Sequence, residues 1–315
     1  MQFNSIIWSG NNLFNVGLAS PKTLINIHPL WTNELIPLSQ WQEYKKLQTN
    51  DGLNLRAWCK KATSHIKSKI IVCGQCNSTM MVCRSFLEKD VLSTWDCILS
   101  VSQNKGHGQY GRNWHSPPGN IYASFVFPSS FAVSNKSEQL SWSKITSLLV
   151  GYAISQAFEN IKIPVKLKWP NDLILNGYKV GGILVEEKND VPIIGIGINL
   201  DSAPLQKELF RKNYVMPATA LNLVGFNFTP LTFWEKIYSD SIKIIKKTVE
   251  LYSVSKLLEV LSQIMLWGGE EVMVILPCEV PFKAQIKGIA NDGGLILQSK
   301  TGKRVIYSGS VFSPT

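Results

Sequence analysis

The chain of 315 residues is 45% hydrophobic and 17% charged, which is ordinary for a folded protein with a buried core and argues against a disordered chain. No apolar run approaches the ~18 residues of a membrane-spanning helix, and Met1–Ser5 lacks the basic stretch of a signal peptide. We therefore expect a cytoplasmic protein with no membrane partner. The formal net charge of +10 indicates an acidic partner (nucleic acid, an anionic protein or a phosphorylated substrate) without choosing among them.

Residues 1–68 have the least readable pattern of the chain. Their lysines and arginines outnumber their acidic residues. Short helices are predicted at 40–48 and 53–66. A helix-turn-helix is not predicted, because a compact three-helix pattern with its own apolar core is not evident.

From Lys69 onwards the pattern is typical of an α/β domain. Short apolar runs predict strands, and apolar residues at helical spacing predict helices. Asn176-Gly177 lies between two apolar runs and predicts a β-hairpin. The predicted strands are 70–72, 96–103, 122–127, 165–169 and 193–200, and the predicted helices are 78–89, 138–160, 231–252 and 255–266.

The C-terminal end changes character and predicts a small β-barrel, because short strands alternate with turns such as Asn291-Asp292-Gly293. These strands are 271–276, 282–290, 295–298 and 304–307. The predicted fold class is α/β (α+β), with a central mixed sheet and flanking helices plus this small C-terminal barrel. We place the domain boundaries at 1–68, 69–266 and 267–315.

Cys73 and Cys76 have the spacing of a redox or zinc pair. A zinc site would need two more ligands, and no second cysteine pair or nearby histidine pair supplies them in the sequence. We therefore favour reduced, partly buried thiols for these residues and predict no protein-bound metal.

The first stretch that indicates chemistry is the glycine-rich run from Lys105 to Trp114. Gly106, Gly108 and Gly111 let the backbone approach a ligand closely and direct N–H groups at it. Arg112 adds a fork of donors that suits phosphate or carboxylate. An ordinary glycine-rich surface turn would have the same composition, and a Walker A loop is excluded because a Gly-Lys-Ser/Thr ending is missing.

A second stretch, Lys168-Trp169-Pro170-Asn171-Asp172, places an amide and a carboxylate at the end of a predicted strand. Lys179 lies on the return arm of the hairpin, so it can approach Asp172. The alternatives are a Pro-Asn-Asp turn and a lysine on a solvated strand face. A third stretch, Gly195-Ile-Gly-Ile-Asn199, has glycines within a strand, which indicates close approach of a ligand or simply tight packing.

Together these segments resemble the biotin–protein ligases. The resemblance rests on Gly-x-Gly-x-x-Gly-Arg-x-Trp at 106–114, Ser116-Pro117, Gly119-Asn-Ile-Tyr122, Lys-Trp-Pro-Asn-Asp at 168–172, Lys-x-Gly-Gly-Ile-Leu-Val-Glu at 179–186 and Gly-Ile-Gly-Ile-Asn at 195–199. It covers residues 70–225, and the final strands resemble the family's small SH3-like C-terminal domain. It implies a biotin or lipoate ligase-like catalytic domain that uses ATP, Mg²⁺ and biotin to form biotinyl-5′-AMP. The biotin then passes to a lysine of the biotin carboxyl carrier domain of a biotin-dependent carboxylase.

The resemblance also implies residue roles. Ser78 and Thr79 would bind the biotin rings, although capping of the following helix is an alternative for both. Lys179, Arg112 and Asp172 would be catalytic: Lys179 and Arg112 would stabilise negative charge, and Asp172 would accept a proton from the acceptor amine, fix that amine or simply hold the hairpin. The remaining residues implied to bind biotin or nucleotide are Gln103, Gly106, His107, Gly108, Gln109, Gly111, Trp114, Lys168, Asn171, Gly182 and Asn199.

Two loop residues depart from the family, in which arginine is frequent where this chain has His107 and Gln109. The loss of a charged fork at Gln109 predicts faster escape of biotinyl-AMP. Three alternatives stay open: a biotin-responsive DNA-binding repressor, a lipoate or octanoate transferase of related fold, and an inactive biotin-binding module. DNA is not the expected partner, and a homodimer would be common for the family.

Overall fold

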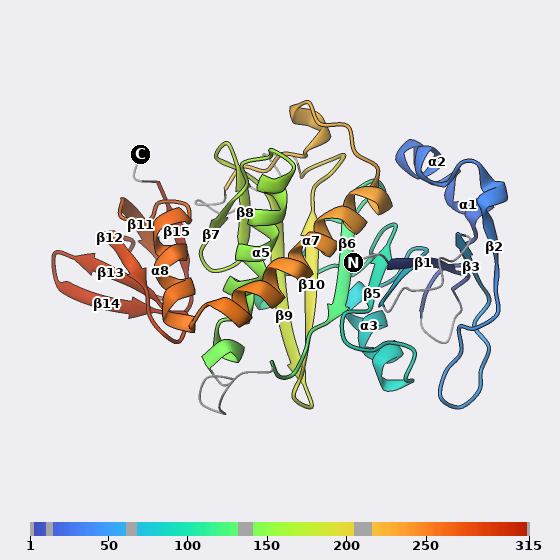
Figure 1. The fold of residues 1–315 in the computed structure, drawn as a ribbon. Coiled ribbons are helices and arrows are strands. Elements are labelled where there is room, and N and C mark those ends of the chain that lie inside the picture. Colours follow the sequence, from blue (N-terminus) through green and yellow to red (C-terminus); the bar gives the residue numbers. More distant parts are fainter. Residues whose placement is uncertain (1–2, 11–14, 61–67, 132–140, 205–215, 314–315) are drawn as a thin grey trace. The chain divides into compact units, whose positions relative to one another are not determined.

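The computed structural model describes residues 3–10, 15–60, 68–131, 141–204 and 216–313 (Figure 1). The chain divides into two compact units. The first unit comprises residues 1–129, 180–204 and 219–239, and the second comprises 130–179, 205–218 and 240–315. Within the described residues, no helix combines the length and the apolar character that a membrane crossing requires.

The first unit is built on a mixed sheet with the strand order β2-β3-β1-β4-β5-β6-β10-β9. The pairs β1–β4 and β4–β5 are parallel, whereas the other pairs are antiparallel. This arrangement confirms the predicted mixed sheet. The strands are β1 (Phe3–Trp8), β2 (Trp41–Tyr44), β3 (Ala57–Lys60), β4 (Ser68–Cys73), β5 (Cys97–Ser100), β6 (Ile121–Val126), β9 (Tyr178–Lys188) and β10 (Val191–Ile198).

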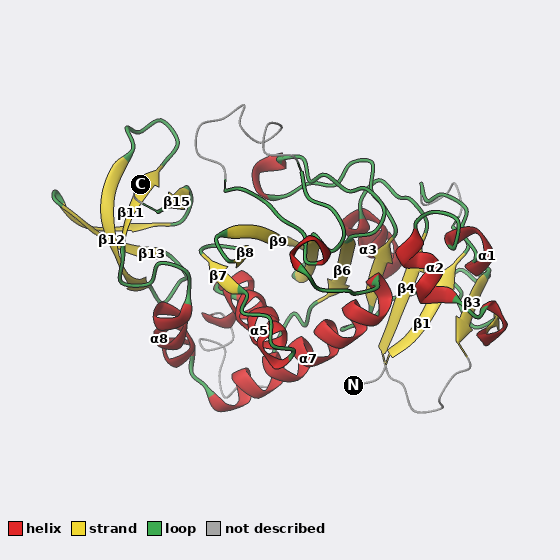
Figure 2. Cartoon of the chain, turned by 90° about the horizontal axis from the view of Figure 1, so that it is seen from above, coloured by secondary structure: helices red, strands yellow, loops and turns green. Residues whose placement is uncertain are grey.

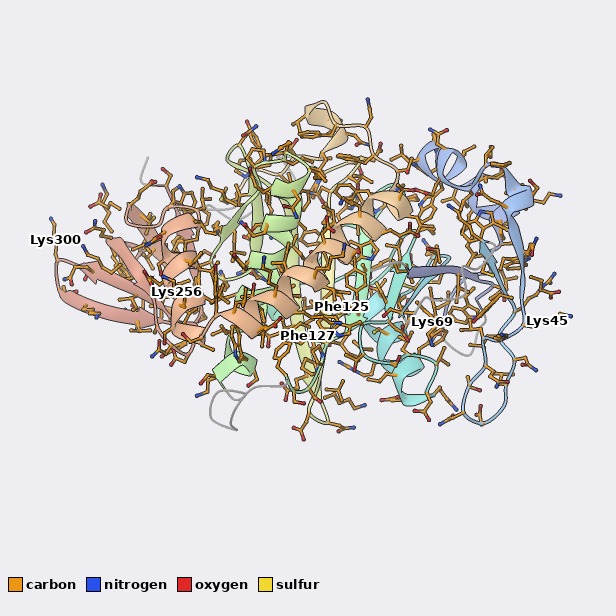
Figure 3. All side chains as sticks on the ribbon, viewed as in Figure 1. Lys45, Lys69, Phe125, Phe127, Lys256 and Lys300 are labelled. Carbon is orange, nitrogen blue, oxygen red and sulfur yellow. The ribbon has the colours of Figure 1, made fainter. Side chains whose placement is uncertain are left out.

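Helices cover this sheet and complete its core. Helix α3 (Thr79–Glu88) packs on β5, β6 and β10, and the ring of its Phe86 lies 4.7 Å from that of Trp8 in β1. The first part of α7 (Pro230–Leu251) also packs here, since the indole N–H of Trp234 donates to the Cys97 sulfur at 3.3 Å. Phe125, labelled in Figure 3, is buried, and its ring lies 4.9 Å from that of Tyr238.

The N-terminal segment corrects two predictions. The helix predicted at 40–48 is wrong, because Trp41–Tyr44 forms strand β2 after a short 3-10 turn. The helix predicted at 53–66 is also wrong, because Ala57–Lys60 forms β3, and the rest of that range from residue 61 lies outside the described residues. The physical reason is period-two burial: Leu55 and Ala57 are buried, whereas Arg56 between them is exposed.

This segment also contains three elements that the sequence pattern did not predict. They are β1 and the short helices α1 (Pro21–Leu24) and α2 (Pro29–Leu35). Strand β1 lies between β3 and β4 (Figure 2). Residues before position 69 therefore contribute three strands to the sheet that carries α3.

The remaining predicted elements are found within a few residues of their expected bounds. The strand predicted at 96–103 ends at Ser100. The predicted hairpin forms, with Asn176 and Gly177 both at positive φ between β8 (Asp172–Leu175) and β9, as the two-residue turn requires. The helix predicted at 138–160 is described as α5 (Thr146–Asn160), and residues 138–140 lie outside the described residues.

The second unit contains α5, the hairpin strands β7 (Lys166–Lys168) and β8, helix α8 (Val254–Ile264) and a five-stranded antiparallel sheet. That sheet confirms the predicted small C-terminal β-domain, with β15 as a strand beyond those predicted. Its order is β14-β13-β12-β11-β15, from β11 (Glu271–Ile275), β12 (Phe282–Ile289), β13 (Leu295–Ser299), β14 (Gly302–Ile306) and β15 (Ser310–Phe312). The division of the chain at 68 and 266 stays a prediction.

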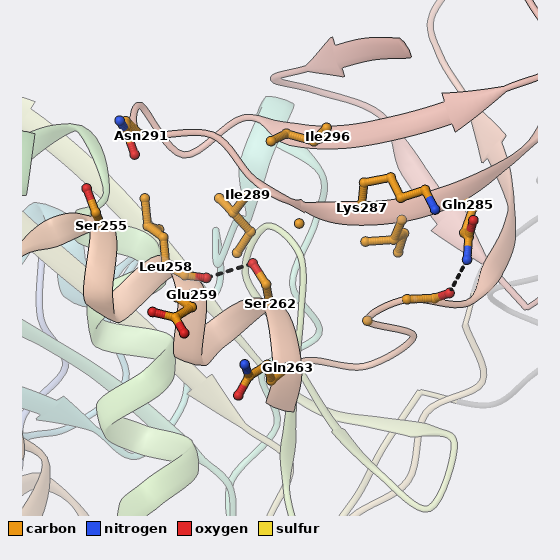
Figure 4. A pocket seen from close by; sticks show the side chains of 14 residues that line it. Ser255, Leu258, Glu259, Ser262, Gln263, Gln285, Lys287, Ile289, Asn291 and Ile296 are labelled. Carbon is orange, nitrogen blue, oxygen red and sulfur yellow. Dashed lines mark hydrogen bonds between the residues drawn. The ribbon is translucent and has the colours of Figure 1, made fainter. Parts of the chain in front are cut away.

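A cavity of about 620 Å³ lies between α8 and the β12–β13 strands. Figure 4 shows Glu259 and Ser262 of α8 on one side and Lys287, Ile289 and Ile296 on the other. None of the predicted site residues lines this cavity. Lysines such as Lys256 and Lys300 project from the surface of the same unit (Figure 3).

Candidate active site

The start of α3 is tied to the strand and loop around it by a buried polar network. The Thr79 hydroxyl accepts a hydrogen bond from Ser124 at 2.8 Å and donates to Gln103 Oε1 at 3.2 Å, which the Thr79 backbone N–H also reaches at 2.8 Å. Gln103 Nε2 donates in turn to Ser116 Oγ at 3.1 Å, and that hydroxyl donates to the Trp114 carbonyl. Such a satisfied network fixes the rotamers of its members.

Ser78 lies at the N-cap of α3 and is 2% exposed, yet its side chain makes no capping hydrogen bond. The capping alternative is thus not realised for Ser78. The hydroxyl of Thr79 is likewise used for side-chain contacts with β6 and Gln103 rather than for the helix end. The predicted biotin-binding residues Ser78, Thr79 and Gln103 are therefore neighbours in one polar patch.

The glycine-rich run forms a narrow loop that folds back on itself. The Trp114 N–H donates to the Gly106 carbonyl at 2.9 Å, and the Gly108 N–H donates to the Arg112 carbonyl at 2.8 Å. A Cβ at Gly106 would lie 2.5 Å from Ser116 Oγ and 2.8 Å from Gln103 Nε2, so a side chain there would break the polar network. Gly106 is required for this close approach.

The outer part of this loop is open to solvent. Gln109–Gly111 forms a single 3-10 turn in which Tyr110 has φ +59° and Gly111 has φ +68°. The Arg112 guanidinium lies 5.8 Å from the Tyr110 ring centroid, and both side chains are exposed. Gly108 and Gln109 are half-buried. Arg112 is therefore free to turn towards a phosphate without first leaving the core.

Trp114 packs on the paired glycines of the sheet. Gly197 of β10 lies opposite Gly182 of β9, and a Cβ at Gly197 would lie 2.5 Å from the indole ring. Next to it, Asn199 is 4% exposed and its amide donates to the Thr219 carbonyl at 3.1 Å. Gly182, Trp114 and Asn199 thus lie close together around β9 and β10.

Asn120 is a site residue to which sequence reasoning assigned no role. Its Oδ1 accepts from the backbone N–H groups of Leu200, Asp201 and Ser202 at 2.8–3.1 Å, and its Nδ2 donates to the Ser202 carbonyl. This buried amide holds the turn that follows Asn199. The only signal in the sequence was its place in the Gly119-Asn120 pair of the family motif.

A second group of predicted residues lies in the second unit, where one carboxylate joins two ammonium groups. Asp172 Oδ1 lies 2.5 Å from Lys179 Nζ, and Oδ2 lies 3.2 Å from Lys168 Nζ. Burial opposes ionisation of Asp172, but the charges and hydrogen bonds of Lys179 and Lys168 lower its pKa to about 2. Asp172 is therefore an ionised partner that Lys179 and Lys168 share.

The C-terminal sheet contacts this group. The Lys168 side chain is 6% exposed, and its ammonium lies 5.7 Å from the centroid of the Phe312 ring in β15. The Trp169 indole donates to the Gly293 carbonyl at 3.0 Å. Trp169 is thus a packing residue of this unit, and Asn171, half-buried, occupies the turn between β7 and β8.

His107 contacts a residue that the sequence analysis left without a role. Its Nε2 lies 3.1 Å from Glu186 Oε1 on β9, and the other oxygen of Glu186 lies 2.8 Å from Arg84 Nη2 on α3. Burial opposes ionisation of Glu186, but the hydrogen bonds from His107 and Arg84 lower its pKa below the usual value.

Cys73 and Cys76 are buried free thiols, as the reduced-thiol interpretation expects. The hydrogen bond between Cys73 and Cys76, together with burial, raises the pKa of the Cys73 thiol well above its ordinary value. Within the described part of the chain, no group of three or more histidine, cysteine or acidic side chains could hold a metal ion. Cys76 instead forms a backbone bridge with Gln103, so this pair supports the polar network.

Two family models match the chain in the regions just described. Residues 72–202 match the biotin/lipoate A/B protein ligase family, so the site belongs to a protein ligase of this class. Residues 268–313 match the biotin protein ligase C-terminal domain. Together the two regions cover more than half of the sequence.

Characterised relatives agree with these models. The chain is 28% identical over 228 residues to a biotin–[acetyl-CoA-carboxylase] ligase of Paracoccus denitrificans, covering 70% of this chain and 90% of that protein. It is 28% identical over 230 residues to the bifunctional ligase/repressor BirA of Bacillus subtilis, where the match covers 68% of this chain and 65% of that protein.

Solved structures of biotin protein ligases are also similar to this chain. The biotin protein ligase of Aquifex aeolicus in complex with biotin and ATP aligns with a TM-score of 0.62 and 28% identity, over 78% of this chain and 99% of that one. The biotin protein ligase of Leishmania major with biotinyl-5-AMP, at 20% identity and a TM-score of 0.53 over 77% of this chain and 99% of that one, shares the fold. The chain therefore belongs to the biotin protein ligase family.

Proposed function

We propose that this protein is an ATP-dependent biotin–protein ligase. It activates biotin as biotinyl-5′-AMP and transfers the biotin to one lysine of a biotin carboxyl carrier domain. The observation that carries the proposal is the position of the site residues, since every one of them, from Ser78 to Asn199, lies inside the segment that matches the ligase family model.

In the first half-reaction, a carboxylate oxygen of biotin attacks the α-phosphorus of ATP, and pyrophosphate leaves with the electron pair of the broken P–O bond. The Thr79–Gln103 network presents fixed polar groups to the uncharged biotin rings. Backbone N–H groups of the glycine-rich loop, Arg112 and Lys179 counter the charge that develops around the phosphorus. Positioning and charge stabilisation of this kind account for most of such catalysis.

In the second half-reaction, the neutral amine of the acceptor lysine attacks the biotinyl carbonyl, the amide bond forms and AMP leaves. The amine must lose a proton. A carboxylate with a pKa of about 2 is a poor proton acceptor near neutral pH. This supports the role in which Asp172 fixes Lys179 and the amine rather than the role of general base.

Mg²⁺ is expected to enter with ATP, held by phosphate oxygens and water. The acceptor is expected to be the carrier domain of a biotin-dependent carboxylase, and the lysine-rich chain, with its net charge of +10, suits an acidic surface on that domain. The six free thiols support a reducing, cytoplasmic location. A homodimer stays a prediction taken from the family.

Biotin-dependent exchange of pyrophosphate into ATP tests the proposal, with lipoate and octanoate as parallel acids. Exchange with biotin alone is the expected result. Exchange with lipoate or octanoate instead would favour the related transferases, and binding of biotin without exchange would favour the inactive binding module.

The repressor alternative is not supported by the described part of the N-terminal segment. Its residues form β1, β2 and β3 of the sheet and two helices of four and seven residues. Salt-sensitive, sequence-selective binding to operator DNA, seen as a shift of the DNA band on a gel, would reinstate the repressor alternative.

A further inference from the structure

Glu186 ends the Gly-Gly-Ile-Leu-Val-Glu motif, and the mechanism above does not use it. Its side chain lies on β9 and contacts two other elements of the first unit, with one carboxylate oxygen for each. Oε2 lies 2.8 Å from Arg84 Nη2 on α3, and Oε1 lies 3.1 Å from His107 Nε2 in the glycine-rich loop. We call Arg84, Glu186 and His107 together the latch.

The second ring nitrogen of His107 faces another acceptor. His107 Nδ1 lies 3.3 Å from the carbonyl oxygen of Lys105, within the same loop. A carbonyl and an ionised carboxylate only accept hydrogen bonds, and a neutral imidazole donates through one nitrogen alone. A proton on Nε2 gives the loop a hydrogen bond to Glu186, and that bond is charge-assisted because its acceptor is a carboxylate.

The latch joins the two segments that the proposed function assigns to the ligand. Helix α3 begins with Thr79, and the loop runs through Gly106 and Gly108 to Arg112. The three latch side chains are 29–32% exposed, so solvent weakens their interactions without removing them. A loop that is held by the Gln103 network at its base and by Glu186 at His107 is restricted in how far it can open.

We propose that Glu186 is a positioning residue that holds the glycine-rich loop against β9 and thereby sets how long the enzyme retains biotinyl-AMP. The inference rests on the proposed function. Glu186 itself touches no reacting atom in this scheme and acts through His107. The latch contacts the loop at His107, one of the two positions where arginine is frequent in the family.

The chain offers a matched control for the latch. Lys188 and Glu88 form a second ion pair between the same strand β9 and the same helix α3, at 3.0 Å, and both side chains are 52–54% exposed. Among the described residues, no contact of this pair with the glycine-rich loop is found. Glu88→Gln therefore weakens the bracing of α3 by β9 and leaves the loop contact intact.

The test measures release of labelled biotinyl-AMP, formed on the full-length enzyme and chased with unlabelled adenylate. Glu186→Gln keeps the size of the side chain and removes its charge, and we expect release to become about three- to tenfold faster, as for the loss of a partly exposed charge-assisted contact. Glu88→Gln should stay within about twofold of the wild type.

Release that is unchanged in Glu186→Gln, or equally fast in Glu88→Gln, would overturn the latch. Hydrogen exchange of residues 105–114 in the ligand-free protein gives a second measurement that needs no adenylate, and the latch requires faster exchange in Glu186→Gln than in Glu88→Gln. Pyrophosphate exchange is measured on the same preparations. Its absence from the wild type removes the proposed function and the latch with it, whereas normal exchange with unaltered release removes the latch alone.

Discussion

Replacing Asp172 by Asn tests how the two lysines of the second unit are held. The carboxylate lies 2.5 Å from Lys179 and 3.2 Å from Lys168, and its side chain is only 16% exposed. The asparagine keeps the shape and leaves two ammonium groups without their common partner. A pKa lowered from 3.8 to about 2 corresponds to roughly 2–3 kcal/mol of stabilisation of the ionised form.

That contribution depends on pH in a defined direction. Because the folded state lowers the pKa of Asp172, the stabilisation is fully present above the unfolded value of 3.8 and is lost as the pH falls towards about 2. Urea unfolding should therefore show a loss of roughly 2–3 kcal/mol for Asp172→Asn at pH 7 and a smaller loss at pH 3. Glu259→Gln, which breaks an exposed pair with Lys256, is the control and should cost less than about 1 kcal/mol at either pH.

Measurements of the two half-reactions distinguish the two roles of Asp172, which are to orient Lys179 or to act as a general base. If the carboxylate orients Lys179, pyrophosphate exchange should fall by about a hundredfold in Asp172→Asn, as expected when a charge-stabilising group is misplaced. Acceptor transfer from preformed biotinyl-AMP should fall with it. Normal exchange combined with lost transfer would refute this reasoning and return Asp172 to the role of general base.

Three further substitutions have defined outcomes. Gly197→Ala places a methyl group 2.5 Å from the Trp114 ring and should raise the KM values in pyrophosphate exchange at least about tenfold, because the indole must shift. Thr79→Val breaks the Ser124–Thr79–Gln103 chain and should raise KM for biotin about ten- to a hundredfold in the same assay, with little change in kcat. Trp8→Ala should lower the free energy of unfolding in urea by about 3–5 kcal/mol, because Trp8 is 1% exposed in the core.

The first two of these substitutions have matched controls, and the third has an outcome that would contradict it. Gly195→Ala meets the flexible Met80 side chain, whose sulfur lies 2.8 Å from the new Cβ, and should be much milder than Gly197→Ala. Thr146→Val removes a buried hydroxyl that bonds only within its own helical segment among the described residues, and should leave KM for biotin unchanged. A loss below about 1 kcal/mol for Trp8→Ala would contradict the view that β1 is an integral strand.

The catalytic half of the fold was predictable because its local patterns agree with its tertiary contacts. The Asn176-Gly177 turn, the helix that follows Ser78 and the apolar run at 193–198 each carry a signal within a few residues. The glycine-rich loop and the Lys-Trp-Pro-Asn-Asp segment were recognisable as motifs for the same reason. The proximity of Lys179 and Asp172 followed from the hairpin that joins them.

Other contacts of the proposed site join segments that are far apart in the sequence, and no local sequence pattern predicts them. Asn120 meets the turn at 200–202, and Ser124 meets Thr79, only because β6 lies between β5 and β10. Glu186 on β9 meets His107 in the loop and Arg84 on α3, although the three segments are far apart in the sequence. From the sequence alone, a charged residue at the end of a strand motif is interpreted as solvent-exposed, and only the arrangement of the strands shows its partners.

The N-terminal segment shows most clearly where local patterns mislead. Gln40–Gln48 is rich in residues with good helix propensity, yet Trp41–Tyr44 pairs with β3 as an edge strand. The decisive contacts are long-range, since β1 takes its place beside β4, and Trp8 packs on Phe86. The same segment also reaches the site, because Val16 forms a bridge with Cys76, and His28 lies 3.4 Å from Asp201 just after Asn199. A segment that neither family model matches therefore braces both the biotin end and the nucleotide end of the proposed site, and a deletion of it should impair catalysis through the fold rather than through a lost regulatory domain.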